Sequence, residues 1–380
     1  MDFQETALHT ELRALARRFA QKELHPIIEE DEKAERFRPE MILKMGELGL
    51  TGIPVPEEFG GAGMGYQEYA IVMEEMAAVN TGYAISLAVT GLPQVILNLF
   101  GNPAQKQKYI PPLASGKAIG AFSLSEAGAG SNAGSLRTSA RREGNHYVIS
   151  GTKLWCTQGD VAETIILMAR TGGPGAKGVS SFILEKGTPG FKLGKREKKM
   201  GCHTSHTMEL LFENCKVPVE NLIGNEGDGY KVAMTALDSG RITIGAGAVG
   251  IARAALEAAI SHARQREQFG KPIAEFQGVS FMLADMATEL DAARLLVQRA
   301  AWLKDNGKPF STEAAMAKLF ATDTAMKVTT DAVQVLGGSG YTQDFPVERY
   351  MREAKVMQIV EGTNQIQRMI IGKALTEEQP

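Results

Sequence analysis

A series of short β-type segments between residues 117 and 223 divides this chain into three regions. Stretches such as "GAFSLSEAG", "ETIILMAR" and "GVSSFILEK" are rich in β-branched or aromatic residues, and each is bounded by Gly, Pro, Asn or Ser. Several strands at this spacing, without helices between them, predict a small antiparallel barrel or sandwich. The rest of the chain is therefore organised around a central β domain.

Both flanks of this centre have helical periodicity. Four leucine or phenylalanine residues between positions 8 and 19 repeat at helical spacing. A second apolar series alternates steps of four and three, as in a helix packed in a bundle. Its members are Val279, Leu283, Met286, Leu290, Ala293, Val297 and Ala300. We expect an α+β multidomain chain with an N-terminal helical domain (1–116), a β domain (117–225) and a C-terminal four-helix bundle (226–380).

Composition and charge exclude several classes of partner. The chain has 44% hydrophobic and 22% charged residues, which is ordinary for a soluble globular protein. A formal net charge of -3 gives no reason to expect nucleic acid or a membrane surface. We expect no membrane span and no targeting segment, since no apolar run approaches roughly 18 to 20 residues. Cys156, Cys202 and Cys215 show no CxxC spacing, so a reducing, cytoplasmic setting is expected.

A literal GxGxxG occurs at Gly245, Gly247 and Gly250. A dinucleotide-binding fold would need a βαβ unit and an acidic residue about 20 residues further on. The sequences on both sides, "YKVAMTALDSGR" and "EAAISHARQREQFGK", are typical of helix. We therefore predict a long helix whose glycines allow a close neighbour. A NAD-dependent dehydrogenase that uses this motif is kept as the alternative.

The stretch "CHTSH" places Cys202, His203 and His206 within five residues. Two histidines three apart on a helix could share a metal ion. The stretch lies among strand signals, however, and no outside cluster of ligands would complete the coordination shell. We expect a loop between strands and no metal site.

Three polar stretches could contribute to a ligand site. The turn "SEAGAGSNAG" (125–134) exposes N–H groups and hydroxyls that suit phosphate or a heteroaromatic edge. Trp155 and Thr157 would share one face of a strand, where a planar cofactor could stack. Arg266 and Gln268 lie near a turn that could hold a phosphate or carboxylate. Taken singly, each stretch has an ordinary explanation, as a flexible turn, a core tryptophan or a solvated helix end.

Glu361 is a lone carboxylate in the otherwise apolar stretch "MQIVEGTNQIQRMII". Burial there would raise its pKa and make it a stronger base. Gly362 beside it would let a substrate approach closely. The other interpretation is an acidic residue placed favourably before a helix that begins in "TNQIQRMII". The residues alone leave both interpretations open.

Taken in order, these motifs resemble the acyl-CoA dehydrogenase family, and most closely its short-chain, butyryl-CoA dehydrogenase-like type. The motifs are "SEAGAGS", "WCTQG", "LDSGR", "REQFGKPIAEFQ", "QVLGGSGY" and "VEGTNQIQR". Several independent motifs coincide along essentially the whole chain, so their combination is far more specific than any one of them. The resemblance implies FAD as cofactor, a short- to medium-chain or branched acyl-CoA thioester as substrate and a trans-2-enoyl-CoA as product.

The resemblance also implies which residues contact FAD. They are Phe122, Leu124, Ser125, Ser131, Trp155, Thr157, Arg266, Phe269, Gln277, Gln334, Gly337, Gly338, Thr363 and Gln365. Thr157 would approach flavin N5, whereas Arg266, Phe269 and Gln277 would hold the pyrophosphate and adenine half. The segment 334–338 would act from a neighbouring subunit, which implies a homo-oligomer, usually a tetramer.

For the reaction, the resemblance implies that Glu361 abstracts the α-proton while hydride passes from the β-carbon to flavin N5. The acyl-CoA contacts that it implies are Ser131, Asp238, Arg241 and Gly362. Isovaleryl- and long-chain-type members carry the base one residue before the arginine of the "LDxxR" helix. This chain has Gly240 there, which cannot take a proton. Ala127 and Asn132 depart from the common "EPGxGSD" motif, and they leave the acyl specificity open.

The resemblance suggests an electron-transferring flavoprotein as the acceptor of the electrons. An oxidase that reduces oxygen is a further possibility within the family, and no residue excludes it. A non-catalytic helical interaction protein with the same fold is a third class. The presence of Glu361 and of a complete set of flavin motifs argues against that third class.

Overall fold

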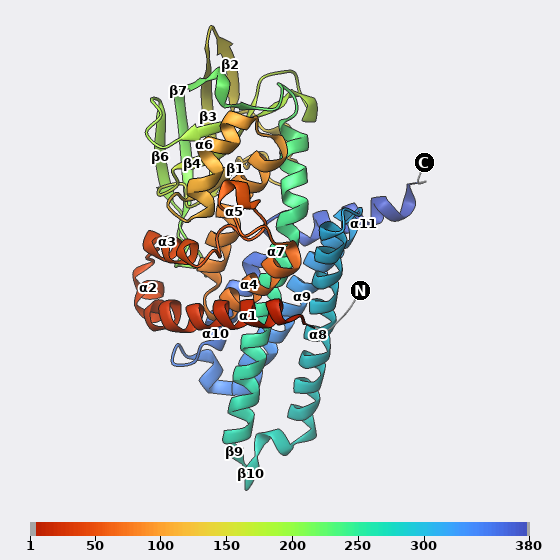
Figure 1. Ribbon diagram of the computed structural model, residues 1–380. Helices are drawn as coiled ribbons and strands as arrows, with labels where there is room; N and C mark the ends of the chain where they lie inside the picture. The colour runs from red at the N-terminus through yellow and green to blue at the C-terminus, as the bar shows by residue number, and fades with distance from the viewer. Residues whose placement is uncertain (1–4, 378–380) are drawn as a thin grey trace.

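A β-sheet lies at one end of the molecule, and long helices run from it toward the other end (Figure 1). The computed structural model describes residues 5–377. Along the chain, helices come first, the sheet follows, and helices return. The predicted helix–sheet–helix architecture is confirmed.

Within the described residues 5–377, six α-helices precede the sheet. They are α1 (Ala7–Phe19), α2 (Ile28–Ala34), α3 (Pro39–Glu47), α4 (Tyr66–Val79), α5 (Thr81–Phe100) and α6 (Pro103–Ala114). In α1, Leu12 and Phe19 of the predicted apolar repeat are buried, whereas Leu8 at the start of the helix is 45% exposed. Helix α1 packs on α4, and α5 packs on both α4 and α6.

Helix α5 contradicts the expectation that no apolar run approaches the length of a membrane span. By length and composition, α5 and the later helix α7 (Gly229–Gln265) both reach that length. In the fold, however, 72% and 83% of their most apolar windows are buried inside the protein. A helix surrounded by other elements needs no polar face, and this explains their composition.

The sheet has eight strands in the order β6-β7-β3-β2-β4-β5-β8, with β1 paired to β4. The strands are β1 (Gly120–Ser123), β2 (Ser139–Glu143), β3 (His146–Thr157), β4 (Thr164–Arg170), β5 (Val179–Glu185), β6 (Phe191–Arg196), β7 (Thr207–Pro218) and β8 (Leu222–Ile223). Strand β4 pairs in parallel with β1 and with the start of β2. The expectation of a wholly antiparallel β domain is therefore corrected to a mixed sheet. The parallel pairs arise because a crossover through other strands, and not a hairpin, joins these partners.

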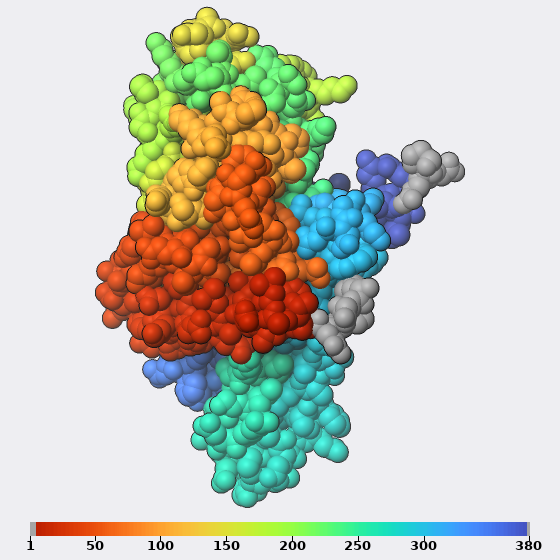
Figure 2. All heavy atoms as spheres, in the orientation of Figure 1, coloured from red at the N-terminus to blue at the C-terminus, as the bar shows by residue number. Residues whose placement is uncertain are grey.

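Long helices form the rest of the molecule. They are α7 (Gly229–Gln265), α8 (Gln277–Asp305), α9 (Ser311–Leu336), α10 (Val347–Met357) and α11 (Asn364–Thr376), with a small hairpin of β9 (Glu267–Gln268) and β10 (Lys271–Pro272) between α7 and α8. The predicted apolar face of α8 is buried from Met286 to Ala300. The hairpin end of α7 and α8 projects beyond the N-terminal helices (Figure 2).

The glycines of the GxGxxG lie inside α7, where neighbours approach closely. A Cβ atom on Gly250 would lie 2.2 Å from the carbonyl oxygen of Glu74. A Cβ atom on Gly245 would lie 3.1 Å from the Val297 side chain. Because the motif lies in the middle of α7 and not at the junction of a strand and a helix, the close-neighbour prediction is confirmed. The NAD-dependent alternative is not favoured.

Candidate active site

Glu361 lies in the turn between α10 and α11 and adopts the left-handed conformation, with φ of 54°. Gly362 follows with φ of 85°. A non-glycine residue with positive φ is uncommon and persists where the surroundings hold it. Thr363 caps α11, because its side chain accepts a hydrogen bond from the Ile366 N–H. The turn, and not the first turn of α11, therefore sets the direction of the Glu361 side chain.

The Glu361 carboxylate lies against α7 at Gly240. A Cβ atom on Gly240 would be 2.6 Å from Glu361 Oε2 and 3.1 Å from Oε1. No larger residue fits at this position unless the carboxylate moves. Gly240 thus leaves the space that the carboxylate from the α10–α11 turn occupies.

The surroundings of Glu361 shift its ionisation. The residue is half-buried, but its Oε2 is shielded from solvent and has no hydrogen-bond partner within residues 5–377. Desolvation raises the pKa of Glu361 to about 7, while the Arg241 and Lys318 cations pull this pKa down. A carboxyl group with a pKa near neutrality is matched to proton abstraction at pH 7.

Two more shielded polar atoms near Gly240, Ser239 Oγ and Arg241 Nε, also lack a partner in the described part of the chain. Arg241 pairs with Asp238 on the same helix. The Asp238 carboxylate accepts a hydrogen bond of 2.9 Å from the Ser311 hydroxyl. Because buried polar groups are normally satisfied by protein or water, these atoms are open to a polar partner such as a ligand or a water molecule. The structure thus brings three predicted substrate contacts, Asp238, Arg241 and Gly362, to one site beside Glu361, while Ser131 is exposed on the glycine-rich turn.

The glycine-rich turn after β1 lies beside the end of β3. The Leu154 N–H donates to the Ser125 carbonyl oxygen over 2.9 Å. Lys153 Nζ donates to the Leu124 carbonyl oxygen and to the Glu126 carboxylate, each over 2.8 Å. Two of the predicted flavin-contacting segments are thereby adjacent. The buried Lys153–Glu126 pair that fixes them carries no motif, and sequence reasoning missed it.

Trp155 presents a large ring to solvent. It is 53% exposed, and its φ is 59°. The register between β3 and β7 shifts between Lys153 and Cys156, so this residue belongs to a bulge that turns the ring outward. Thr157 is half-buried, and the intervening Cys156 is fully buried. A half-exposed ring and a hydroxyl beside the glycine-rich turn fit a planar ring system such as the flavin of FAD.

Three predicted FAD contacts lie far from Trp155 and Thr157. Arg266, Phe269 and Gln277 are at the hairpin end of α7 and α8, opposite the sheet (Figure 1), and Phe269 is 94% exposed. At a rise of about 1.5 Å per residue, Arg266 lies about 39 Å from Gly240 along α7. The structure therefore places the two groups of predicted FAD contacts at opposite ends of the chain.

The remaining predicted contacts divide between the two ends of the molecule. Gln334, Gly337 and Gly338 are exposed where α9 ends and the 3₁₀ turn η8 (Gly337–Tyr341) begins. The Phe345 ring that follows lies 6.0 Å from the His262 ring of α7, so this segment shares the hairpin end. The contacts on the Glu361 side are the half-buried Phe122, Leu124, Ser125 and Thr363 and the exposed Gln365.

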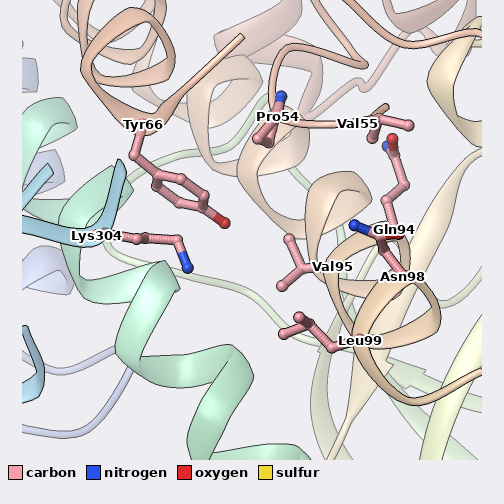
Figure 3. A pocket seen from close by; sticks show the side chains of 8 residues that line it. All are labelled: Pro54, Val55, Tyr66, Gln94, Val95, Asn98, Leu99 and Lys304. Carbon is pink, nitrogen blue, oxygen red and sulfur yellow. The ribbon is translucent and has the colours of Figure 1, made fainter. Parts of the chain in front are cut away.

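The structure also contains a pocket of about 110 Å³ that no sequence motif indicated (Figure 3). It is lined by Pro54, Val55, Tyr66, Gln94, Val95, Asn98, Leu99 and Lys304. The Tyr66 hydroxyl and the Lys304 ammonium both point into it (Figure 3). Burial lowers the pKa of Lys304, while Asp305 and Asp238 raise it. Lys304 Nζ lies 4.7 Å from the centre of the Phe310 ring, and the next residue, Ser311, donates a hydrogen bond to Asp238. The pocket is therefore near the predicted substrate contacts.

The "CHTSH" stretch forms a loop before β7, as predicted. His206 Nδ1 lies 2.5 Å from Asp160, and its Nε2 accepts a hydrogen bond of 3.3 Å from the Phe37 N–H. His203 Nδ1 lies 3.1 Å from Glu32 of α2. This loop joins the N-terminal helices to the sheet. Within residues 5–377, no group of three or more potential metal ligands occurs.

Family models match three successive segments of the chain. Residues 6–117 match the N-terminal domain of acyl-CoA dehydrogenases, residues 121–215 the middle domain and residues 227–376 the C-terminal domain. The matches follow the order in which helices, sheet and helices occur here.

Complete relatives agree with these matches. A short-chain specific acyl-CoA dehydrogenase of Clostridium acetobutylicum is 47% identical over 98% of this chain and 98% of its own. The structure of butyryl-CoA dehydrogenase from Megasphaera elsdenii has a TM-score of 0.97 and 45% identity, over 99% of this chain and 100% of that one. A chain in a structure described as the electron transferring flavoprotein of Acidaminococcus fermentans has a TM-score of 0.98 and 49% identity, with 100% of both chains covered.

Proposed function

The chain belongs to the acyl-CoA dehydrogenase family, and we propose that Glu361 is the base that removes the α-proton of its substrate. The protein is an FAD-dependent oxidoreductase that dehydrogenates acyl-CoA thioesters. One observation carries the assignment of the base. The Glu361 carboxylate lies against Gly240, and its Oε2 is shielded from solvent and has no hydrogen-bond partner in the described part of the chain. Other shielded polar atoms of this site also have no partner there.

The residues around Glu361 make proton removal feasible. The α C–H of a thioester is a weak acid, so a base has to contact it while the thioester oxygen is stabilised. Burial removes water that would solvate the carboxylate and weaken it as a base. We assign the Glu361 backbone N–H as one donor to the thioester oxygen, and Asp238 and Arg241 as contacts of the CoA chain. FAD held beside Trp155 and Thr157 would supply the hydride acceptor for the β-hydrogen.

We propose that the substrate is a short-chain acyl-CoA, because the relatives with high identity include short-chain and butyryl-CoA dehydrogenases. Anaerobic titration of the FAD-loaded enzyme should give the fastest flavin bleaching with butyryl-CoA. Slower bleaching is expected with octanoyl-, palmitoyl- and isovaleryl-CoA. Fastest bleaching by palmitoyl-CoA would contradict the short-chain assignment but would not affect the assignment of Glu361 as the base.

Flavin bleaching should depend on pH through Glu361. Because its pKa is raised to about 7, the carboxylate is mostly protonated at pH 5 and mostly ionised at pH 9. Only the ionised form accepts a proton, so the second-order rate constant with butyryl-CoA should rise with pH, with a midpoint near 7. Stopped-flow absorbance between pH 5 and 9 measures this profile. A rate constant that is already constant from pH 5 upward, as for a glutamate with its ordinary pKa of 4.5, would show a solvated carboxylate.

We also propose that the flavin site is shared between copies of the chain. One copy would present Trp155 and Thr157 to the flavin. Arg266 and Phe269, at the exposed hairpin end of a second copy, would then hold the adenine half. This arrangement accounts for the separation of the two groups in one chain, and a tetramer is the assembly that we expect.

Electrons would leave the reduced enzyme through an electron-transferring flavoprotein. A full-length match to a chain in a structure so described supports this acceptor. We place the enzyme in the cytoplasm and in fatty acid β-oxidation. An oxidase that uses oxygen would instead be reoxidised rapidly by air after bleaching.

A further inference from the structure

Lys318 is a buried cation that the proposed mechanism does not use as a base, an acid or a ligand contact. It lies on α9, and its side chain is fully buried. Its Nζ donates to the Gly362 carbonyl oxygen over 2.9 Å and to Asn364 Oδ1 over 2.8 Å. Lysine is seldom fully buried unless it is paired. Here both of its partners belong to the turn and helix start that follow Glu361.

The Glu361–Gly362 turn is held from two sides. From α11, Gln367 Nε2 donates to the Glu361 carbonyl oxygen over 3.2 Å and to the Gly362 carbonyl oxygen over 2.8 Å. From α9, Lys318 donates to the Gly362 carbonyl oxygen. A turn with two successive positive φ angles needs such support. The Glu361 carboxylate occupies the space that the absence of a side chain at Gly240 leaves. Small movements of this turn would therefore displace the carboxylate from that space.

Two more α9 residues strengthen the same contact. The Thr322 hydroxyl lies 3.1 Å from Asn364 Oδ1, and Asp323 accepts a hydrogen bond of 2.6 Å from Asn364 Nδ2. Asp323 also accepts from Arg368 of α11 over 2.9 Å. Three side chains of α9, Lys318, Thr322 and Asp323, therefore fix Asn364. Of these three, only Lys318 also contacts the turn itself, at the Gly362 carbonyl oxygen.

The charges that face Lys318 come from three parts of the fold. Glu361 of the turn and Asp323 of α9 favour its charged form, whereas Arg241 of α7 opposes it. Burial lowers the pKa of Lys318 to about 7. In return, the ammonium lowers the pKa of Glu361. Lys318 thus acts on both the place and the ionisation of this carboxylate.

We propose that Lys318 is a positioning residue for Glu361, which fixes the turn that carries the carboxylate through its hydrogen bond to the Gly362 carbonyl. This inference rests on the proposed role of Glu361 as the base. In this proposal, Lys318 itself contacts neither the substrate nor the cofactor. Its loss should impair proton abstraction more than ligand binding.

Lys318→Met keeps the length and apolar volume of the side chain and removes the charge and the donors. With FAD-loaded enzyme and butyryl-CoA, the rate constant for bleaching should fall about 100-fold, because small misplacement of a reacting group has effects of this size. The midpoint of its pH profile should rise by about one unit, because a cation that stabilises the carboxylate is gone. The Kd for crotonyl-CoA, which does not bleach oxidised flavin, should change less than about threefold, since a positioning residue does not touch the ligand.

Lys327→Met is the matched control. Lys327 lies on the same helix, is half-exposed and pairs with Glu289 of α8. The Lys327→Met variant should retain the wild-type bleaching rate and the wild-type midpoint of the pH profile. An equal effect of both substitutions would overturn the proposal, because it would show a general response to altered α9 packing.

Other outcomes distinguish the role of Lys318 as a positioning residue from the role of Glu361 as the base. Wild-type rate and midpoint in Lys318→Met, together with an inactive Glu361→Gln, would overturn the role of Lys318 alone. A fall in rate with an unchanged midpoint and an equal loss of crotonyl-CoA affinity would also overturn it. Full bleaching by Glu361→Gln would overturn both inferences. If Lys318→Met does not hold FAD, Lys318→Gln keeps an N–H donor, and the upward shift of the midpoint remains the required result.

Discussion

Replacement of Glu361 by glutamine is expected to leave FAD and acyl-CoA bound and to lower the rate of flavin bleaching by about 10²- to 10⁴-fold. Glutamine keeps the shape of the side chain, so it fits above Gly240, but its amide cannot accept the α-proton. The magnitude is that of a positioned general base. Anaerobic stopped-flow mixing with butyryl-CoA measures the rate, and the flavin spectrum before mixing reports cofactor content.

Stability provides an internal check on the same variant. The folded-state pKa of Glu361 is raised above its ordinary value. The stability that protonation confers is therefore present below pH 4.5 and is lost as the pH rises through about 7. At pH 8 the glutamine variant should thus resist denaturant better than the wild type. Glu348→Gln on α10, which breaks a pair with Arg352, should leave bleaching unchanged.

Gly240→Ala is expected to lower the bleaching rate by about 100-fold, although alanine favours helix. A Cβ atom here would lie 2.6 Å from Glu361 Oε2, so the carboxylate has to move. Displacement of a reacting group by about 1 Å can cost this much. Bleaching by butyryl-CoA is again the measurement, with FAD content determined in parallel.

Gly372→Ala in α11 is the matched control for this substitution. Nothing lies within 4 Å of a Cβ atom at Gly372. It should therefore gain roughly 0.5–1 kcal/mol in the free energy of unfolding, as expected for Gly to Ala inside a helix, with bleaching unchanged. A wild-type rate in Gly240→Ala would mean that the carboxylate does not depend on this space.

Hydrophobic periodicity predicted helices such as α1 and α8, because each of them buries one face. The larger strands β4 and β5, which are buried on both faces, were indicated by their runs of β-branched and aromatic residues. The apolar spacing along α8 indicated the face that is buried in the structure. Strands β2 and β6 carried no such signal. Their sequences, "SARRE" and "FKLGKR", are mostly exposed, so pairing with neighbouring strands and not burial makes them strands. The parallel β1–β4 pair was missed because pairing direction is not encoded in local pattern.

The candidate site could be predicted in part. Gly240 in the sequence already showed which position could not supply a base, but not that a hydrogen there makes room for the Glu361 carboxylate. Lys318 was missed because a lysine in a helical sequence ordinarily points to solvent, and only the packed fold shows its burial. The separation of Arg266 from the site was calculable, since a continuous helix of that length has a fixed rise.

Hydrogen exchange at the α-carbon tests proton abstraction by Glu361 most directly. Butyryl-CoA is incubated anaerobically in D₂O with FAD-loaded enzyme, and deuterium in the recovered thioester is measured by mass spectrometry. We predict that the wild type incorporates deuterium at the α-carbon and that Glu361→Gln with full FAD content does not exceed the rate without enzyme. Incorporation by Glu361→Gln at the wild-type rate would contradict the assignment.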